Sequence, residues 1–267
     1  MGKIKLLIKY FLHKLVSKGA KGHGIHSPFV FKFNRNVLNN NNNYPEYCAI
    51  MNFRSSLIRN RNIITVKDYG AGSLVFSSDK RMTGDIARYT ASSYKTGKLL
   101  FRLVRYFNPD IILELGTSLG FGTFCLAKGV EDSGGKIYSL EACPQQYSIA
   151  SIELGKAGIG NVELINAHFK DKLPELLNKI EKVDFVYFDG DHRKEAVLWQ
   201  FRQCHAKAHS GTLFVVGDIH WSAEMEEAWR ILCCDSSVTL SLDLFYCGLL
   251  FFRKDMAKQK YKLEYSG

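Results

Sequence analysis

Apolar residues recur with a helical period in the first segment of the chain. Between Lys3 and Val16 they occupy positions 4, 7, 8, 11, 12 and 15, and the lysines fall mostly on the other side. This pattern predicts an amphipathic helix. We expect it to pack on its own domain as a cap. The alternative is that residues 1–20 dock to a membrane surface or to a partner.

A second helix is predicted from Pro28, because Ser27 can act as its N-cap and proline fits a first helical turn. Its apolar positions are Phe29, Val30, Phe33 and Val37. The asparagine run at 39–43 then indicates a mobile loop. Four further segments precede residue 110: a helix over 47–59, a strand over 63–67, a polar loop-like stretch over 80–94 and a helix over 97–107.

From residue 110 onward, short apolar runs alternate with helical patterns. The predicted strands are 111–115, 136–140, 162–166, 185–189 and 213–217, and the predicted helices are 122–129, 145–155, 174–180, 193–206 and 223–233. The runs 237–244 and 247–253 predict an antiparallel hairpin. Together these elements predict an α/β fold with a doubly wound, mostly parallel, seven-stranded sheet over residues 96–267. Residues 1–95 are expected to form an N-terminal helical cap or lid.

The first of these strands runs into a glycine-rich turn, from Glu114 to Gly122. Glycine allows the backbone to turn tightly and to approach a ligand closely. A carboxylate at Glu114 would repel a pyrophosphate, and the spacing departs from that of dinucleotide-binding turns. It would attract the ammonium and sulfonium groups of S-adenosylmethionine. The turn therefore predicts a site for that cofactor, cradled by residues that include Gly116, Thr117 and Gly120.

The next strand ends at Glu141, where an acid can accept both ribose hydroxyls of a nucleoside. A solvent-exposed acid at a strand end is the alternative. A second glycine turn, over residues 68–73, lacks the following helix and strand with a terminal acid. It is interpreted as a structural turn, or as part of a lid that touches the site.

With these motifs in place, residues 97–253 resemble the class I S-adenosylmethionine-dependent methyltransferase fold, in its catechol O-methyltransferase-like branch. The stretches at 24–30 and 218–222 resemble a subgroup of methyltransferases found in Bacteroidetes. The resemblance implies that the methionine end of the cofactor is lined by Glu114, Gly116, Ser118 and Gly122. It also implies that the ribose and adenine lie against Glu141, Ala142, His168 and Phe169.

His168 departs from this pattern, because an acid or amide is more usual there. Ring packing or simple exposure is the alternative for His168. The fourth strand ends at Asp189, which the resemblance assigns to the substrate, the cofactor or a metal. His192 falls where the catechol enzymes carry a catalytic lysine, and imidazole can accept a hydroxyl proton near neutral pH. Alternatively, His192 simply opens the following helix.

The fifth strand ends with Gly217 and Asp218, where metal-dependent relatives have two ligand residues. One expected ligand is therefore missing. Asp189 and Asp218 remain candidate ligands of Mg²⁺, in a weakened site. Trp221 and His220 are expected either to wall the substrate pocket or to serve packing alone.

The net charge of +10, concentrated at the two ends of the chain, is compatible with an anionic partner. A nucleic-acid partner is not expected, since neither a separate binding module nor an Asn-Pro-Pro-Tyr-like motif is present. The seven cysteines have no regular spacing, which predicts free thiols in a reducing cytoplasm. No apolar run is long enough to span a bilayer.

These observations favour transfer of a methyl group to the oxygen of a small-molecule acceptor. Methylation of RNA or protein, or a non-catalytic cofactor-binding scaffold, are the alternatives. A homodimer is compatible with the sequence. The identity of the acceptor is not encoded in any motif of residues 1–95.

Overall fold

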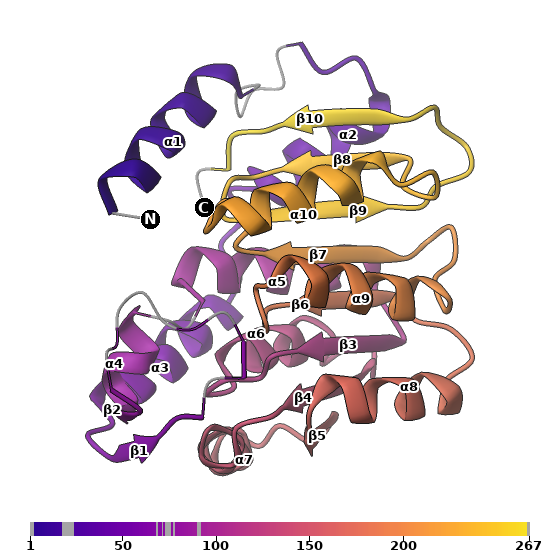
Figure 1. Ribbon diagram of the computed structural model, residues 1–267. Coiled ribbons are helices and arrows are strands. Elements are labelled where there is room, and N and C mark those ends of the chain that lie inside the picture. Colours follow the sequence, from indigo (N-terminus) through magenta and orange to yellow (C-terminus); the bar gives the residue numbers. More distant parts are fainter. Residues whose placement is uncertain are drawn as a thin grey trace. The chain divides into compact units, whose positions relative to one another are not determined.

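The computed structural model describes residues 3–17, 24–67, 69–70, 72, 76, 78–89 and 92–265. The chain forms two compact units: the first joins Met1–Asn41 to Glu181–Gly267, and the second is Asn42–Ile180. Both contain strands and helices (Figure 1). The functional boundary near residue 95 stays a prediction.

Three parallel strands form the sheet of the second unit in the order β3-β4-β5. They are β3 (Ile111–Leu115), β4 (Lys136–Glu141) and β5 (Val162–Asn166). The helices that follow them are α6 (Phe121–Gly129), α7 (Pro144–Lys156) and α8 (Phe169–Lys179). Parallel strands need such crossover connections, and the alternation of apolar runs with helical patterns predicts them closely.

The rest of the second unit is mainly helical, with α3 (Glu46–Arg59), β1 (Ile63–Thr65), β2 (Lys80–Met82), α4 (Thr83–Tyr89) and α5 (Tyr94–Phe107). Helix α5 begins where the Ser93 hydroxyl accepts a hydrogen bond from the Thr96 backbone N–H. It approaches α6 closely at Gly97, where a Cβ would lie 2.8 Å from the sulfur of Cys125.

The prediction of a loop over 80–94 is wrong, because this stretch contains β2, α4 and the start of α5. Polar residues dominate its sequence, but Ile86 is buried at 1% exposure. Gly84 lies so close to the end of α3 that a Cβ there would stand 2.3 Å from the carbonyl oxygen of Ile58. Packing against α3 therefore stabilises a helix that local composition does not indicate.

Five strands form the sheet of the first unit in the order β10-β8-β9-β7-β6. They are β6 (Phe185–Phe188), β7 (Leu213–Gly217), β8 (Leu240–Asp243), β9 (Cys247–Phe251) and β10 (Gln259–Lys262). Strands β6 and β7 are parallel, and β8 and β9 form the predicted antiparallel hairpin. Strand β10 runs parallel to β8 and adds a strand to the seven predicted.

Helices cover both faces of the strands in the first unit. On one face, a Cβ at Gly248 of β9 would stand 2.3 Å from the Trp229 ring of α10 (Ala223–Cys234). On the other face, the Phe251 ring contacts Phe33 of α2 (Pro28–Phe33) at a centroid distance of 5.7 Å. Residues 248 and 251 point to opposite faces of a strand. Helix α9 (Lys194–His205) lies beside α10 (Figure 1). The doubly wound prediction is confirmed.

The predicted cap of α2 is confirmed, since the Ser27 hydroxyl accepts from the Val30 N–H at 3.4 Å and Pro28 occupies the first turn. A π-helical turn, η1 (Asn34–Leu38), continues the helix. Val30, Phe33 and Val37 are fully buried. All seven cysteines are free thiols, as predicted.

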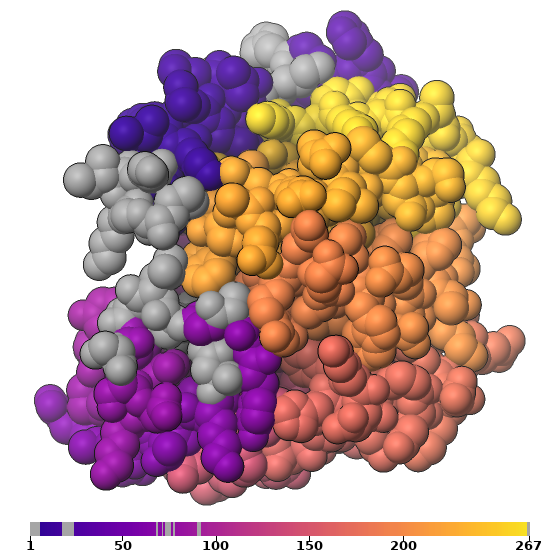
Figure 2. All heavy atoms as spheres, viewed as in Figure 1, coloured from indigo at the N-terminus to yellow at the C-terminus, as the bar shows by residue number. Residues whose placement is uncertain are grey.

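The predicted amphipathic helix is α1 (Lys3–Val16), and it packs on its own unit through its polar side. His13 is 7% exposed, and the Lys9 ammonium pairs with Glu226 at 2.7 Å. The apolar side is exposed, and Figure 2 shows this helix in indigo at the surface. Its exposed residues are Leu7, Ile8, Phe11, Leu12, Leu15 and Val16, at 54–81%. Within the described ranges, no helix is long and apolar enough to cross a membrane.

Candidate cofactor and acceptor residues

The glycine-rich turn lies between β3 and α6 in the second unit. Gly116 and Gly120 have φ angles of 108° and 84°, in the region that favours glycine. A Cβ at Gly120 would also stand 3.2 Å from the Leu154 side chain. Ser118 adopts a φ of 49°. Thr117 and Gly122 are buried, so packing against the rest of the unit holds the turn in place.

Glu114, the fourth residue of β3, is 1% exposed. Its Oε2 accepts hydrogen bonds from the hydroxyls of Thr123 and Ser139, at 2.5 and 2.6 Å. Its Oε1 is buried and has no hydrogen-bond partner among the described residues. Burial raises the pKa of Glu114 to about 7, against the lowering effect of the two hydroxyls. An unpartnered buried carboxylate oxygen fits a cationic ligand such as an ammonium group.

Glu141 ends β4 and is 9% exposed, so the alternative of a solvent-exposed acid is wrong. Its Oε2 accepts from the Ser118 N–H and its Oε1 from the Cys143 N–H, each at 2.8 Å. The carboxylate is therefore held against the glycine turn. A carboxylate in this position is a suitable acceptor for ribose hydroxyls. Ala142, the next residue, is half-buried.

His168 and Phe169 stand at the start of α8, with His168 as the N-cap residue. The His168 ring is exposed and meets the edge of the Tyr69 ring, with centroids 4.1 Å apart. Tyr69 belongs to the second glycine turn, of which residues 68, 71 and 73 lie outside the described residues. This contact favours the lid interpretation for the described part of that turn.

In the first unit, the residues after β6 and β7 lie together at the carboxyl ends of these parallel strands. The Nε2 of His192 lies 3.6 Å from Oδ2 of Asp218. The ring centroids of His192 and Trp221 are 6.0 Å apart. Helix α9 begins at Lys194 with Arg193 as its N-cap, so His192 is not the residue that opens it. The structure thus brings together His192, Asp218 and Trp221.

Gly217 determines what the neighbouring acids can bind. A Cβ at this position would stand 2.5 Å from Oδ1 of Asp189, so no larger residue fits beside that carboxylate as it lies. Gly217 itself offers no side chain that could act as a third ligand. Asp189 and Asp218 join no cluster of three metal-binding side chains within the described residues. The residues present do not fit a magnesium centre of the catechol type.

His220 lies between two carboxylates. Its Nδ1 lies 3.0 Å from Oε1 of Glu226, and its Nε2 lies 3.0 Å from Oδ2 of Asp243. His13 of α1 reaches the same carboxylate, with Nε2 2.9 Å from Oδ1. Sequence reasoning missed this cluster because His13 and Asp243 are 230 positions apart and no motif connects them.

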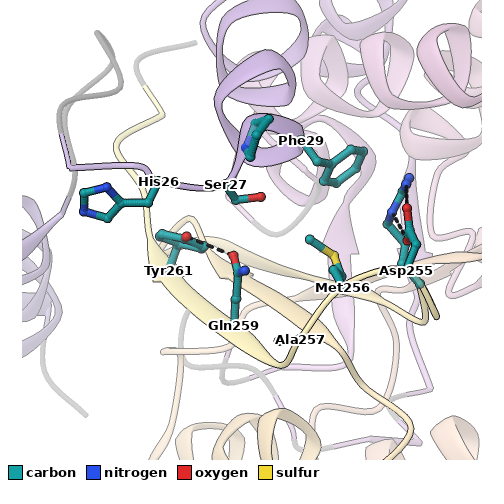
Figure 3. A pocket seen from close by; sticks show the side chains of 10 residues that line it. His26, Ser27, Phe29, Asp255, Met256, Ala257, Gln259 and Tyr261 are labelled. Carbon is teal, nitrogen blue, oxygen red and sulfur yellow. Dashed lines mark hydrogen bonds and ion pairs between the residues drawn. The ribbon is translucent and has the colours of Figure 1, made fainter.

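A hollow of about 370 Å³ lies elsewhere in the first unit, lined by the start of α2 and by residues 253–261 (Figure 3). Figure 3 shows Tyr261 hydrogen-bonded to Gln259 at its wall. Leu213 of β7 pairs with Phe251, just before this hollow, whereas Gly217 pairs with Cys247. The hollow therefore lies at the opposite end of the strands from Asp218. We assign it no part in the proposed chemistry.

Residues 113–219, from β3 to the turn after β7, match a family described as "Methyltransferase domain". This stretch of the chain is therefore similar to a methyltransferase domain. The O-methyltransferase from Bacillus cereus, solved in complex with SAH, shares its fold at a TM-score of 0.56 and 18% identity. That match covers 79% of this chain and 92% of the other.

Two curated catechol O-methyltransferases are similar in sequence to the methyltransferase domain. The protein from Mycobacterium tuberculosis is 29% identical over 130 residues, 48% of this chain and 57% of the relative. The protein from Niastella koreensis is 27% identical over 125 residues, 46% of this chain and 55% of the relative. The chain thus spans about half the length of the curated relatives it matches.

Proposed function

We propose that this protein transfers a methyl group from S-adenosylmethionine to an oxygen of a small-molecule acceptor. The observation that carries the proposal is the buried Oε1 of Glu114, which has no hydrogen-bond partner among the described residues and lies at the glycine turn. A buried carboxylate oxygen costs free energy unless it is paired. The ammonium group of the cofactor would pair it. Similarity to catechol O-methyltransferases supports the oxygen acceptor.

In this proposal, the residues of the second unit hold the cofactor. Glu114 binds its ammonium group, and Gly116, Thr117, Ser118, Gly120 and Gly122 let the backbone approach it. Glu141 accepts the ribose hydroxyls, while its contacts to Ser118 and Cys143 keep it in place. Ala142, His168 and Phe169 flank the adenine. When bound, the cofactor supplies a methyl group already activated on a sulfonium.

The residues of the first unit act on the acceptor. His192 accepts the hydroxyl proton, and the Asp218 carboxylate at 3.6 Å orients the imidazole and stabilises it once protonated. Trp221 flanks His192 and orients the acceptor. Asp189, which follows β6, is the second candidate catalytic residue of this unit.

Binding and turnover test separate parts of this proposal. Calorimetry should show saturable binding of S-adenosylhomocysteine that is weakened in Glu114→Gln. Glu175→Gln is the matched control, since Glu175 is an exposed acid of the same unit paired with Lys172. A panel of catechols, phenols and alcohols then tests transfer. Absence of cofactor binding would refute the proposal, and binding without turnover on any acceptor would favour the scaffold alternative.

We also infer that α1 makes a peripheral contact with an anionic membrane surface. Its outward face carries six exposed apolar side chains, and the helix contains four lysines and no acidic residue. An exposed apolar face on a helix without acidic residues is compatible with an interfacial helix. The same face could instead pair two copies of the chain, which is the homodimer alternative.

Sedimentation with vesicles distinguishes membrane binding from pairing of two copies of the chain. The protein should bind phosphatidylglycerol-containing vesicles more strongly than pure phosphatidylcholine vesicles, and Phe11→Ser with Leu15→Ser should abolish binding. Ile152→Ser is the control, because Ile152 is a similarly exposed apolar residue of α7. A dimer in light scattering that the α1 variant dissociates, with no vesicle binding, would assign the face to self-association.

A further inference from the structure

Three side chains from distant parts of the chain converge in the first unit, and the proposed methyl transfer uses none of them. His13 comes from α1, His220 from the turn after β7, and Asp243 from the end of β8. His13 and Asp243 are 7% and 5% exposed. Within the described part of the chain, they are the one group of three histidine, cysteine or acidic side chains whose possible metal-binding atoms all lie within 4.8 Å of one another.

The separations suit a small cation. Nε2 of His13 lies 2.9 Å from Oδ1 of Asp243, and Nε2 of His220 lies 3.0 and 3.2 Å from its two oxygens. Ligands on a tetrahedral zinc ion at its usual bond lengths stand roughly 3.3 Å apart. A shift of a few tenths of an ångström would therefore admit the ion.

Each ligand is also oriented by an outer partner. Nδ1 of His220 faces Oε1 of Glu226 at 3.0 Å, and Nδ1 of His13 faces the Ser17 hydroxyl at 3.0 Å. Oδ1 of Asp243 accepts the Phe245 N–H at 2.9 Å. A histidine whose second nitrogen donates to a carboxylate or another oxygen is the usual arrangement around protein-bound metals.

The outer partners are compatible with rings that present Nε2 to a metal. Nδ1 of His220 must carry a hydrogen to donate to the Glu226 carboxylate. The Ser17 hydroxyl lies 2.7 Å from the carbonyl oxygen of His13 and 3.0 Å from its Nδ1, and it can donate its one hydrogen to only one of them. When it donates to the carbonyl oxygen, Nδ1 of His13 donates to Ser17. In that arrangement, the neutral forms of both rings present a bare lone pair on Nε2.

Two bare lone pairs aimed at one carboxylate repel it. Without a cation, each ring must instead direct a hydrogen on Nε2 at the carboxylate, and His220, which lies between the carboxylates of Glu226 and Asp243, must be imidazolium. With a divalent cation both rings stay neutral, and their lone pairs become metal ligands.

We propose that His13, His220 and Asp243 bind a divalent transition-metal ion of the zinc type, with water as a further ligand. Two imidazoles and one carboxylate are ligands that zinc takes readily, whereas Mg²⁺ prefers oxygen ligands alone. The ion would fasten α1 by its polar side to the β7 and β8 ends. It is distinct from the magnesium position of catechol-type relatives, since neither Asp189 nor Asp218 belongs to it.

Metal analysis of the full-length protein tests the site directly. After dialysis against zinc and then metal-free buffer, wild-type protein should retain about one zinc per chain by mass spectrometry of the metal. His13→Ala should retain none. Glu226→Gln, which alters only an outer partner, should weaken zinc affinity by about 10–100-fold. Titration with Co²⁺ should give the visible absorption of a four-coordinate site, and His13→Ala should lack it.

A matched control uses another histidine–carboxylate pair of the same unit. His209 lies 2.8 Å from Asp184 with no second histidine beside it, so His209→Ala should keep its zinc. Circular dichroism of His13→Ala must show a folded protein, and Asp243→Asn provides a second ligand variant. The proposal is overturned if wild-type protein retains no zinc, or if both His13→Ala and Asp243→Asn still retain it. The three side chains would then be held together by hydrogen bonds alone.

Discussion

The carboxylate of Asp189 lies over the α-carbon of Gly217, at a distance that leaves no room for a side chain there. A Cβ at 217 would stand 2.5 Å from Oδ1 of Asp189 and 3.1 Å from the carbonyl oxygen of Phe188. Gly217→Ala should therefore displace Asp189 and destabilise the fold by about 1–3 kcal/mol, as overpacked substitutions do. Thermal unfolding with turnover measurements would check this. Unchanged stability and activity would mean that Asp189 moves aside without consequence.

The same relationship predicts that catalysis depends little on Mg²⁺. Once an acceptor is found, Mg²⁺ can be added to enzyme that is loaded with zinc and free of magnesium. The rate should change by less than about tenfold, because an enzyme that needs a Lewis acid loses far more activity without it. His192→Ala should lower kcat by roughly 10²–10⁴-fold, because it removes the proton acceptor. His209→Ala is its control. Full dependence on Mg²⁺ would show that Asp189 and Asp218 suffice as a metal site.

Glu141 offers a test of the ribose contact. Glu141→Ala should weaken binding of S-adenosylhomocysteine by roughly 1–3 kcal/mol, because ribose hydroxyls and two backbone N–H groups lose their acceptor. Calorimetry measures the loss. Glu153→Ala, which removes an acid of α7 paired with Lys156, should leave the affinity unchanged. Equal affinities in wild-type protein and Glu141→Ala would remove Glu141 from the site.

Cofactor affinity should fall as the pH decreases below about 7, where burial places the pKa of Glu114. The ammonium group binds the carboxylate form, so each pH unit below this value costs up to about tenfold in affinity. Calorimetry of S-adenosylhomocysteine from pH 5 to 8 measures the slope. Glu114→Gln should bind more weakly and lose this dependence, and a slope that persists in that variant would assign it to another group.

The stability of the cofactor-free protein should change in the opposite direction. The folded pKa of Glu114 lies above its ordinary value of 4.5. Its contribution to folding is therefore complete below pH 4.5 and is lost as the pH rises through about 7. The loss amounts to about 3 kcal/mol. Denaturant unfolding at pH 5 and 8, compared with Glu114→Gln, isolates this contribution from that of other groups.

Deletion of residues 1–17 should leave cofactor affinity unchanged, because α1 belongs to the first unit and the proposed cofactor residues to the second. It should also remove vesicle binding and bound zinc. Calorimetry, sedimentation and metal analysis of one truncated protein test the three expectations together. Loss of cofactor binding by a truncation that still folds would contradict this separation.

Local sequence predicts the strands of this fold well, because short apolar runs alternate with helical patterns along the chain. Strands β3, β5 and β7 have the predicted bounds. Helix α4 was not predictable from local composition, since its packing against α3 stabilises it. The glycine turn, Glu114 and Glu141 follow from spacing along adjacent strands.

The orientation of α1 required the structure. A hydrophobic period shows that a helix has two unlike faces, but it does not tell which face the protein covers. Here Lys9 and His13 face Glu226 and Asp243, acids more than 200 positions away along the chain. No local pattern encodes such pairs. For the same reason, the sequence does not predict that His13, His220 and Asp243 lie together.

The path of the chain through its two units has a consequence for synthesis on the ribosome. The second unit is one continuous segment, whereas the first is completed only when residues 181–267 join residues 1–41. The continuous segment can fold while the remainder is still being made. Helix α1 must meanwhile wait for Asp243, 230 positions later than His13, with its apolar and polar faces both uncovered. Throughout that interval, Lys9 and His13 lack the acids that they contact in the folded protein.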